Sequence, residues 1–447
     1  MEAVERFLKE HNITEVESTL PDLTGNARGK FYPTKKFLAE KGGRLPESVL
    51  VQTVTGEWAD NHYELVDPSD RDMHLRPDPA TLRLVPWTDE PTAQVINDCY
   101  TADGLLHPLS SRTVLRRVLN LFEKEGLKPV IAPEMEFYLI QKNNDPDYEL
   151  KPATGRSGRQ ESARQSYSID AVNEFNPFID TLYNYCEAQG LDVDTLIHEQ
   201  GAAQMEINFL HGDPLNLADQ VYFFKRTLRE AAFKHGIYAT FMAKPMQNEP
   251  GSAMHIHQSI IDVKSGKNIF ASEEGNFSEK FHNYLGGLQK YIPSAISFFA
   301  PNVNSYRRFA PDNAAPINMK WGIDNRTAGL RIPESDPAGT RIENRFPGSD
   351  CNPYLAIAAS LACGYLGIKN SLQPTKPTYD AAAEDGDTVE LARTLEEGLR
   401  LLEDCPELRD IMGSDFVDAY IGVKRAEFET FHRVISSWER EYLLLNV

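Results

Sequence analysis

Two glutamates inside an apolar stretch are the residues whose spacing most needs a chemical explanation. Glu134 and Glu136 interrupt the run V-I-A-P-E-M-E-F-Y-L-I at residues 130–140, which has the β-branched and aromatic composition of a buried strand. Side chains two residues apart on a strand share a face. Two like charges there repel each other and lose hydration. A bound divalent cation would explain the pair, and so would two buried salt bridges to arginine.

The same spacing recurs on other predicted strands. His255 and His257 lie two residues apart in A-M-H-I-H-Q-S, and Ser259 follows two residues later. Three more glutamates belong to predicted strands or end them: Glu199, Glu206 and Glu343. A single histidine is more often an ordinary core residue, but carboxylates together with imidazole favour Mg²⁺ or Mn²⁺ over zinc. We therefore predict a metal centre.

Arginines form a second group of candidate functional residues. They are Arg307, Arg308, Arg326, Arg331, Arg341 and Arg345. A single arginine is usually surface charge, but several near a metal centre would bind carboxylate or phosphate, because the guanidinium fork matches both anions. The chain has no P-loop motif and no convincing dinucleotide fingerprint, so a nucleotide site would have to be of another type.

Composition narrows the class of protein. The 447 residues are 41% hydrophobic and 25% charged, which allows two domains and a large core. The net charge of −20 disfavours a nucleic-acid partner. No apolar run is long enough for a membrane helix, and the acidic start M-E-A-V-E-R-F-L-K-E lacks the form of a signal peptide. We expect a cytoplasmic protein with no membrane partner. Its five scattered cysteines should be reduced and mostly buried.

The first part of the chain is expected to be a small α+β domain, residues 1–105. A helix at 4–10 precedes probable strands, which fall at residues 15–20, 30–33, 81–86 and 94–98. Glycine and proline punctuate them. The polar link at 100–108 is the probable boundary, and the second domain comprises residues 106–447.

The second domain should place its metal ligands on a sheet backed by helices. A helix at 110–125 precedes the strand with which we began. The long polar segment 141–168 is predicted to be a mobile flap over a site, with simple disorder as the alternative. Helices and strands then alternate at 177–188, 191–199, 204–210, 217–235, 238–244 and 252–260. This order is consistent with an antiparallel or mixed sheet, and the chain from Pro353 onward is expected to be largely helical.

Taken together, the motifs resemble those of glutamine synthetase. In order they are A-P-E-M-E-F, H-E with Q-M-E, F-M-A-K-P-M with G-S-A-M-H-I-H-Q-S, N-S-Y-R-R-F, N-R-T-A-G-L-R-I-P and R-I-E-N-R-F-P. The resemblance implies an α+β fold with an N-terminal β-grasp domain and a catalytic domain built on a curved antiparallel sheet. It also implies a ringed homo-oligomer, typically a dodecamer in this family, in which a neighbour's N-terminal domain completes each site.

The resemblance assigns roles by position. Glu136, Glu199 and Glu206 match the ligands of one metal, and Glu134, His255 and Glu343 match those of a second. Arg308, Arg326, Arg345 and the Gly251 backbone match the glutamate pocket. His257, Ser259, Arg331 and Arg341 match positions near the phosphates of ATP. Among these residues, we expect Glu136, Arg326 and Arg345 to act in catalysis.

The implied reaction has two steps. The glutamate γ-carboxylate attacks the γ-phosphate of ATP to give an acyl phosphate, and a nitrogen nucleophile then displaces phosphate. Metals and arginines would neutralise the transferring phosphoryl group, and a flap would exclude water.

Two departures from the family pattern concern the nitrogen nucleophile. Glutamine synthetases carry a glutamate in the loop after N-S-Y-[KR]-R, where this chain has Ala314, and an N-terminal aspartate where this chain reads V-Q-T-V-T-G-E-W, with no aspartate between Pro46 and Trp58. Both carboxylates serve ammonium, so their loss predicts a larger amine. Glu57, Asp60 and Glu64 are candidates to contact its cationic end.

Three hypotheses remain open. The segments G-R-S-G-R and S-Y-S-I-D-A-V-N-E-F resemble γ-glutamylpolyamine synthetases, so the first is an ATP-dependent ligase that joins glutamate to a polyamine or alkylamine. The second is a true glutamine synthetase with a rearranged ammonium site. The third is a catalytically silent relative with an assembly or sensor role, which the intact set of repelling carboxylates disfavours.

Overall fold

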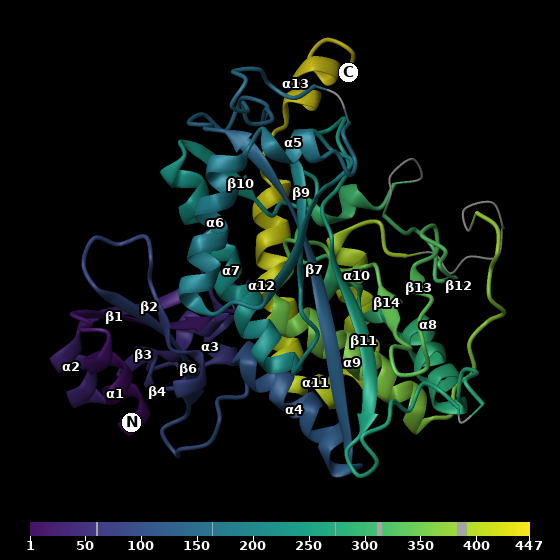
Figure 1. Cartoon of the computed structure of the whole chain (residues 1–447), viewed down its shortest axis with the longest axis horizontal. Helices are drawn as coiled ribbons and strands as arrows, with labels where there is room; N and C mark the ends of the chain where they lie inside the picture. The colour runs from purple at the N-terminus through teal and green to yellow at the C-terminus, as the bar shows by residue number, and fades with distance from the viewer. Residues whose placement is uncertain (60, 163, 273, 311–314, 382–390) are drawn as a thin grey trace.

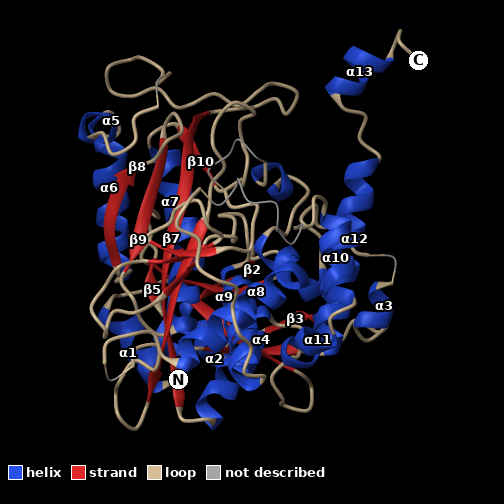
Figure 2. Cartoon of the chain, turned by 90° about the vertical axis from the view of Figure 1, so that its right-hand side faces the viewer, coloured by secondary structure: helices blue, strands red, loops and turns tan. Residues whose placement is uncertain are grey.

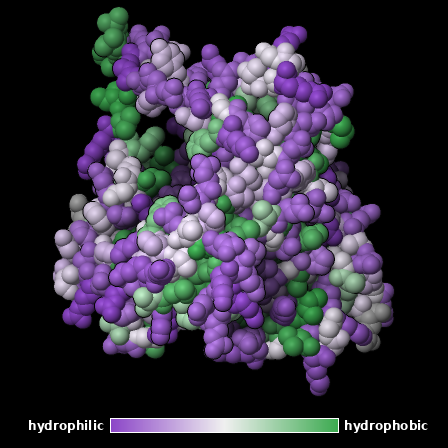
Figure 3. Space-filling model, turned by 60° about the vertical axis from the view of Figure 1, so that its left-hand side comes forward, coloured by the Kyte–Doolittle hydropathy of each residue, from purple (hydrophilic) through white to green (hydrophobic). Residues whose placement is uncertain are grey.

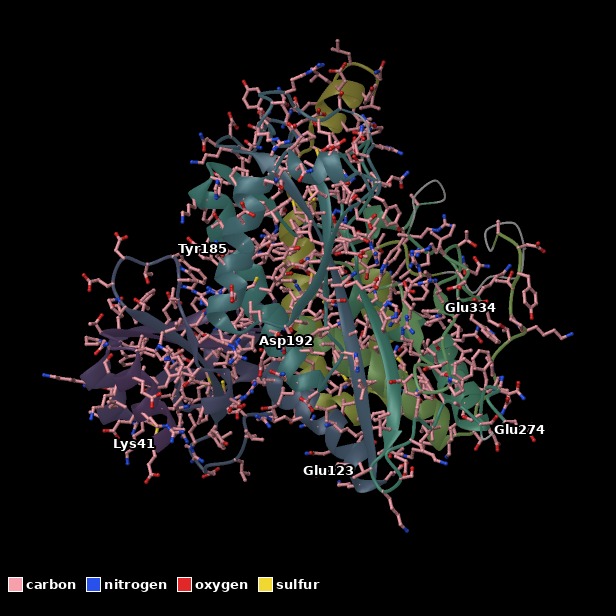
Figure 4. The ribbon with its side chains drawn as sticks, viewed as in Figure 1. Lys41, Glu123, Tyr185, Asp192, Glu274 and Glu334 are labelled. Atoms are coloured by element: carbon pink, nitrogen blue, oxygen red, sulfur yellow. The ribbon has the colours of Figure 1, made fainter. Side chains whose placement is uncertain are left out.

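The computed structural model describes residues 1–59, 61–162, 164–272, 274–310, 315–381 and 391–447. Two sheets organise the chain, one of six strands and one of eight (Figure 1). The smaller sheet lies at one end of the molecule with Lys41 at its outer edge, and Glu274 lies at the opposite end (Figure 4).

The N-terminal part folds around the six-stranded sheet. Its strands are β1 (Glu15–Pro21), β2 (Ala27–Pro33), β3 (Arg44–Pro46), β4 (Asp72–Pro77), β5 (Arg83–Leu84) and β6 (Thr92–Tyr100), in the order β2-β1-β6-β4-β3 with β5 on β6. Its helices are α1 (Glu2–Glu10), α2 (Thr34–Glu40), η1 (Glu47–Val51), α3 (His62–Leu65) and η2 (Pro79–Thr81). The strand expected at 81–86 is therefore shorter than expected, because residues 79–81 form a turn of 3₁₀ helix. The boundary after residue 105 stays a prediction, and it falls between β6 and the next helix.

The larger sheet contains the predicted metal ligands. Its strands are β7 (Leu127–Gln141), β8 (Val193–His198), β9 (Gln204–Phe209), β10 (Ile237–Thr240), β11 (Met254–Asp262), β12 (Trp321–Ile323), β13 (Leu330–Ile332) and β14 (Ile342–Asn344). The order is β12-β13-β14-β11-β7-β9-β8, with β10 also on β7. All neighbours pair antiparallel except β12 and β13, which are parallel. The sheet is thus mostly antiparallel with one parallel pair, which is the mixed alternative that the order of elements allowed.

Most of the helices after β6 pack behind this sheet, directly or on one another, and the last one stands apart. They are α4 (Ser111–Lys124), α5 (Ile169–Asn173), α6 (Asn176–Gln189), α7 (Pro214–Lys234), α8 (Glu279–Phe299), η3 (Ser305–Arg308), α9 (Pro353–Lys369), α10 (Leu395–Glu403), α11 (Pro406–Met412), α12 (Ser414–His432) and α13 (Ser437–Leu443). The helices α4 and α7 pack on β7, and α9 packs on α4, α7 and α8. Helix α8 is the one long helix that the sequence analysis did not identify.

Strand β7 shows why the two sides of the sheet differ. Met135, Phe137 and Leu139 alternate along it and are fully buried in the main hydrophobic core. Glu134 and Glu136 lie between them and therefore face away from the core. Hydrophobic burial beneath β7 thus fixes the register that presents the carboxylates.

The C-terminal segment stands apart from this packing. Helix α13 has no buried residue and lies away from the body of the molecule (Figure 2). No helix among the described residues is long and apolar enough to cross a membrane.

Candidate functional site

Four adjacent strands place the predicted ligands on one face of the larger sheet. Register pairs Glu136 of β7 with Glu206 of β9. It pairs Glu134 with His255 of β11, and His257 with Glu343 of β14. Because residues that are directly opposite share a face, all of these side chains point to the same side of the sheet.

Glu136, Glu199 and Glu206 form the most acidic part of the site. Each of the three glutamates offers a carboxylate oxygen within 4.8 Å of the other two. Burial, followed by repulsion from Glu199, raises the pKa of Glu136 to about 8. Burial and the charges of Glu134 and Glu136 raise the pKa of Glu206 to about 10. Without a cation, this triad binds protons well above the ordinary range of a carboxylate.

Glu134 connects that triad to the two histidines. It groups with Glu206 and His255 on one side and with His257 and Glu343 on the other, each group within 4.8 Å. Burial opposes ionisation of Glu134, but the hydrogen bonds of His255 and His257 together hold its pKa well below the usual range. Glu206 belongs to the first predicted ligand set, and it also lies close to Glu134 and His255 of the second set. His257 lies beside the second set as an additional residue.

The hydrogen bonds of His257 show which of its two ring nitrogens carries the proton. The Arg341 guanidinium, which can only donate, lies 3.2 Å from His257 Nδ1, so Nδ1 accepts. His257 Nε2 therefore carries the proton and donates to Glu134 Oε1 at 2.9 Å. His257 was predicted to lie near the ATP phosphates. In the structure it also holds Glu134 in place through this hydrogen bond.

Arginines neutralise Glu343 at the edge of the cluster. Arg331 Nη1 donates to Glu343 Oε2 at 2.7 Å, and Arg345 pairs with the other oxygen. Burial opposes ionisation of Glu343, but Arg345 and the histidines lower its pKa to about 2. The Nε atoms of Arg331 and Arg345 are buried without a hydrogen-bond partner among the described residues. Both remain able to donate to an anionic ligand.

Arg308 depends on the absence of a side chain at Gly251. A Cβ at residue 251 would lie 2.4 Å from Arg308 Cγ and 2.8 Å from the Ala243 carbonyl oxygen. The Arg308 guanidinium donates to the Phe346 carbonyl. Gly251 thus lets the arginine stem pass against the backbone on its way to the cavity.

The donor set fits divalent cations. Buried glutamates directly opposite one another on neighbouring strands destabilise the fold unless a cation lies between them. Carboxylate oxygens with one or two imidazoles suit Mg²⁺ or Mn²⁺. Glu134, Glu136, Glu199, Glu206, His255 and Glu343 are thus positioned to hold such ions, with His257 beside them.

Two adjoining cavities flank the cluster, and Glu134 and Asn208 line both. The larger, about 710 Å³, is lined by Glu136, Glu199, Glu206, His255, Gly251, Arg308, Arg326, Arg331 and Arg345. The smaller, about 360 Å³, is lined by His257, Ser259 and Arg341. Of the four residues predicted near the ATP phosphates, Arg331 alone lines the larger cavity.

The segments predicted to shape the amine site lie elsewhere or outside the described residues. Glu57, Trp58 and Glu64 line a separate cavity beside α12. Within one chain they are therefore not part of the two catalytic cavities. Asp60 and Ala314 are outside the described residues.

The sequence analysis missed several residues of the larger cavity. Gln204 Nε2 donates to the Gly251 carbonyl at 3.0 Å, and its position two residues before Glu206 was a usable signal. Ser166 and Tyr167, at the end of the predicted flap, also line the cavity. Closure of that flap stays a prediction.

A link between the predicted flap and the metal ligands was also missed. Glu161 Oε2 lies 3.1 Å from His198 Nε2 and accepts from the Ala203 amide at 2.8 Å. His198 Nδ1 lies 2.7 Å from the Glu199 carbonyl oxygen. Glu161 therefore fixes the turn that carries Glu199.

Comparison with known proteins agrees with this geometry. The family profile described as "Glutamine synthetase, catalytic domain" matches residues 108–443. Glutamate–isopropylamine ligase of a Pseudomonas species is 34% identical over 445 residues, 98% of this chain and 96% of that protein. Gamma-glutamylputrescine synthetase PuuA of Escherichia coli K12 is 34% identical over 453 residues, 99% of this chain and 94% of that protein.

A solved structure extends the likeness to the fold. The structure titled "Apo GmaS without ligand" superimposes with a TM-score of 0.84 at 28% identity, covering 98% of both chains.

Proposed function

The chain belongs to the glutamine synthetase family, and on that premise we propose that it joins the γ-carboxylate of glutamate to an alkylamine or polyamine with ATP as co-substrate. The observation that carries this proposal is the buried carboxylate cluster on β7, β9, β11 and β14, with arginines around it. Such a site binds cations and anions together, as phosphoryl transfer to a carboxylate requires.

In the first step, glutamate and ATP approach each other from the two adjoining cavities, which meet at Glu134 and Asn208. Arg308, Arg326 and Arg345 bind the carboxylates of glutamate in the larger cavity. A γ-carboxylate oxygen attacks the γ-phosphorus of ATP, the bond to the β-phosphate oxygen breaks, and ADP leaves. Bound Mg²⁺ or Mn²⁺ supplies charge neutralisation for the phosphoryl oxygens.

The second step replaces phosphate by nitrogen. The neutral amine attacks the acyl carbon of γ-glutamyl phosphate, the acyl carbon–oxygen bond breaks, and inorganic phosphate leaves. The amine nitrogen loses one proton as the amide forms. Ser166 and Tyr167 lie at the cavity wall, where they help to keep water from the acyl phosphate.

The amine is proposed to be larger than ammonium. Two relatives that match nearly the whole chain are named for isopropylamine and putrescine. The chain also has alanine at residue 314, where glutamine synthetases have a glutamate that serves ammonium. A less anionic and less crowded amine site favours a carbon-bearing amine.

The test is glutamate-dependent phosphate release from ATP with isopropylamine, putrescine, spermidine and ammonium as separate substrates. We expect kcat/KM for at least one organic amine to exceed that for ammonium by more than tenfold. Faster turnover with ammonium would identify a glutamine synthetase instead, and no turnover with any amine would indicate the silent relative.

We further propose that the protein is a homo-oligomer, ringed and dodecameric as the family resemblance implies. Apolar side chains of the C-terminal segment support association with further copies. Val434, Ile435, Trp438, Leu444 and Leu445 are all exposed, and apolar atoms project at the upper left of Figure 3. A patch of this kind marks an interaction surface.

Light scattering of the full chain should give a mass of about twelve chains. Removal of residues 434–447 should lower that mass while the far-ultraviolet circular dichroism stays native. A full chain that is monomeric at micromolar concentration would contradict the oligomer.

A cytoplasmic location belongs to the same proposal. The need for ATP supports it, and so do the five cysteines, which are buried and unpaired. Fractionation of the source cells should recover the activity with other ATP-dependent cytoplasmic enzymes, and recovery from a secreted fraction would contradict it.

A further inference from the structure

A third cavity lies on the opposite side of the larger sheet from the metal cluster, where α7 meets the β1–β2 turn. It has a volume of about 470 Å³ and shares no lining residue with the two catalytic cavities. Sites for small molecules occupy roughly 300–1,000 Å³. Three cationic side chains of α7 line it: Lys225, Arg226 and Arg229.

The first two of these cations have partners. Arg226 Nη2 donates to Glu17 Oε2 at 2.6 Å, and Arg226 Nη1 donates to Gln94. Lys225 Nζ donates to the Cys351 carbonyl at 2.8 Å, which leaves two of its protons free. Neither side chain therefore lacks a partner.

Arg229 differs from its neighbours. Among the residues that the structure describes, no hydrogen bond or ion pair reaches its guanidinium. Its contact is with the ring of Phe241, whose centroid lies 5.4 Å from Arg229 Cζ and also 5.4 Å from Lys225 Nζ. Burial and the charge of Arg226 lower the pKa of Arg229, so its environment disfavours the charge that it carries.

Two carboxylates, Asp350 and Glu230, line the cavity, and Asp350 Oδ1 has no hydrogen-bond partner among the described residues. Asp350 Oδ2 accepts from Asn302 at 2.8 Å and from Ser305 at 2.6 Å. Burial raises the pKa of Glu230, against the opposing charge of Arg226, which lies four residues earlier on the same helix. Neither carboxylate forms an ion pair with Arg229 among the described residues.

Among the described residues Arg229 has no carboxylate partner, although the chain has 66 acidic and 46 basic residues. A half-buried guanidinium without one, beside a lysine that shares its aromatic neighbour, is complementary to an external anion. Phe233 and Met242 line the same cavity and are well exposed, so they offer apolar surface to the rest of a ligand.

We propose that this cavity binds a small organic anion whose carboxylate or phosphate pairs with Arg229 and whose apolar part packs on Phe233 and Met242. Within one chain the cavity shares no lining residue with the two catalytic cavities, and the proposal does not depend on the ligase reaction. Its chemistry is that of a carboxylic acid or a phosphate monoester, both of which match the guanidinium fork.

Calorimetric titration with benzoate, phenyl phosphate and benzyl alcohol tests the site, because the three probes share one apolar ring and differ in charge. Benzoate or phenyl phosphate should bind the full protein, and benzyl alcohol should not. The acid that binds more tightly identifies carboxylate or phosphate as the preferred head group. Arg229→Gln should weaken the tighter acid at least about tenfold. Arg6→Gln, the same charge change on the exposed face of α1, is the matched control and should change affinity less than twofold.

A second variant tests the site even if Arg229→Gln does not fold. Asn26→Asp adds a negative charge at the exposed turn on the other wall of the cavity, and it should weaken the acid several-fold. Equal affinity in the wild type and in Arg229→Gln would overturn the proposal, as would no binding of either acid. A change in assembly mass of Arg229→Gln without any anion binding would show that a second copy supplies the carboxylate, which would also overturn it.

Discussion

At the scale of single residues, the most informative contact is the cross-strand pair of Glu136 and Glu206. The two glutamates are directly opposite each other on neighbouring strands, and both are buried. Like charges in that position cost stability, on the order of 0.2–1 kcal/mol even at exposed sites. Either protons or a cation can neutralise this pair, so a bound metal should stabilise the fold at pH values where the carboxyls would otherwise be ionised.

Replacement of Glu206 should affect the stability of the metal-free protein and its metal binding in opposite directions. Glu206→Gln removes a group that can ionise, so above about pH 8, where Glu136 loses its proton, we expect the metal-free variant to unfold at an equal or higher urea concentration than the wild type. The same change removes a ligand, so Mn²⁺ affinity should fall at least about tenfold and turnover should be lost. Unfolding in EDTA and Mn²⁺ electron paramagnetic resonance measure the two effects.

Glu149→Gln, at an exposed position in the segment 141–168, is the matched control and should change neither quantity. A Glu206→Gln protein that is less stable without metal, yet binds Mn²⁺ normally, would show that Glu206 is a structural residue.

The raised pKa values also predict how stability depends on pH. In the folded, metal-free protein the pKa of Glu136 is about 8 and that of Glu206 about 10, whereas an unfolded glutamate titrates near about 4.3. Between these pKa values the folded state holds protons that the unfolded state has lost. The stabilisation of the folded state by these protons is therefore complete below about pH 4 and is lost as pH rises through about 8 and about 10.

In EDTA, the free energy of unfolding should therefore fall between pH 6 and pH 9, by on the order of 1 kcal/mol per pH unit for each group still protonated. Saturating Mg²⁺ should flatten the slope, because the metal replaces the protons. Urea unfolding at several pH values measures this dependence. A metal-free stability that is constant or rises across this range would contradict the assigned burial of the triad.

At the scale of elements, the strand pattern of the sequence predicted part of the candidate site, and the family motifs supplied the other residues. The strand pattern gave β7 and β11 and the shared faces of Glu134 with Glu136 and of His255 with His257. Strand neighbours cannot be predicted in this way, because pairing brings together residues far apart in sequence. The hydrogen bond from Arg341 to His257 and the Glu206–Glu134 contact were therefore not predicted from spacing.

Elements with mixed signals were also missed. Helix α8 contains Pro293 and paired glycines, which weaken its helical pattern. The expected strand at 81–86 begins with a turn because Pro79 starts a 3₁₀ helix, whose first amide is capped by Asp78. For α8, tertiary packing overrides local propensity, whereas the turn at residues 79–81 follows from local capping that the sequence reading overlooked.

The contact of Glu161 with His198 predicts that the segment 141–168 helps to position a metal ligand. Glu161→Ala should leave His198 and the Ala203 amide without their acceptor and loosen the turn that carries Glu199. We expect Mn²⁺ affinity to fall by about tenfold or more, with a smaller loss in overall stability. Glu161→Gln keeps an acceptor oxygen and should restore much of the affinity. If both variants bind Mn²⁺ like the wild type, Glu161 anchors only the loop.

At the scale of the whole molecule, Arg112 joins the two sheets. Its buried guanidinium on α4 donates to Asp219 of α7, to Asp98 of β6 and to Asp78 beside η2, at 2.6 to 3.0 Å. Burial would lower the pKa of Arg112, but Asp219 and the other aspartates raise it. The N-terminal sheet thereby holds a fixed position against the catalytic sheet.

Removal of this arginine should be costly. Arg112→Met leaves buried aspartates without their partner, and we expect a loss of about 3–5 kcal/mol in the free energy of unfolding. Arg116→Met, one turn further along the same helix and half-exposed, contacts two of the same aspartates and should lose less than about 1 kcal/mol. Equal losses in the two variants by urea denaturation would show that burial does not decide the strength of this network.

The central claim is that the γ-carboxylate of glutamate is activated by phosphorylation and then joined to an amine. Transfer of ¹⁸O tests it most directly. With glutamate labelled by ¹⁸O in the γ-carboxylate, plus ATP, Mg²⁺ and isopropylamine or putrescine, each inorganic phosphate released should contain one ¹⁸O atom, and the γ-glutamyl amide should form in equal amount. Phosphate without ¹⁸O, or ATP hydrolysis without amide, would contradict the proposed reaction.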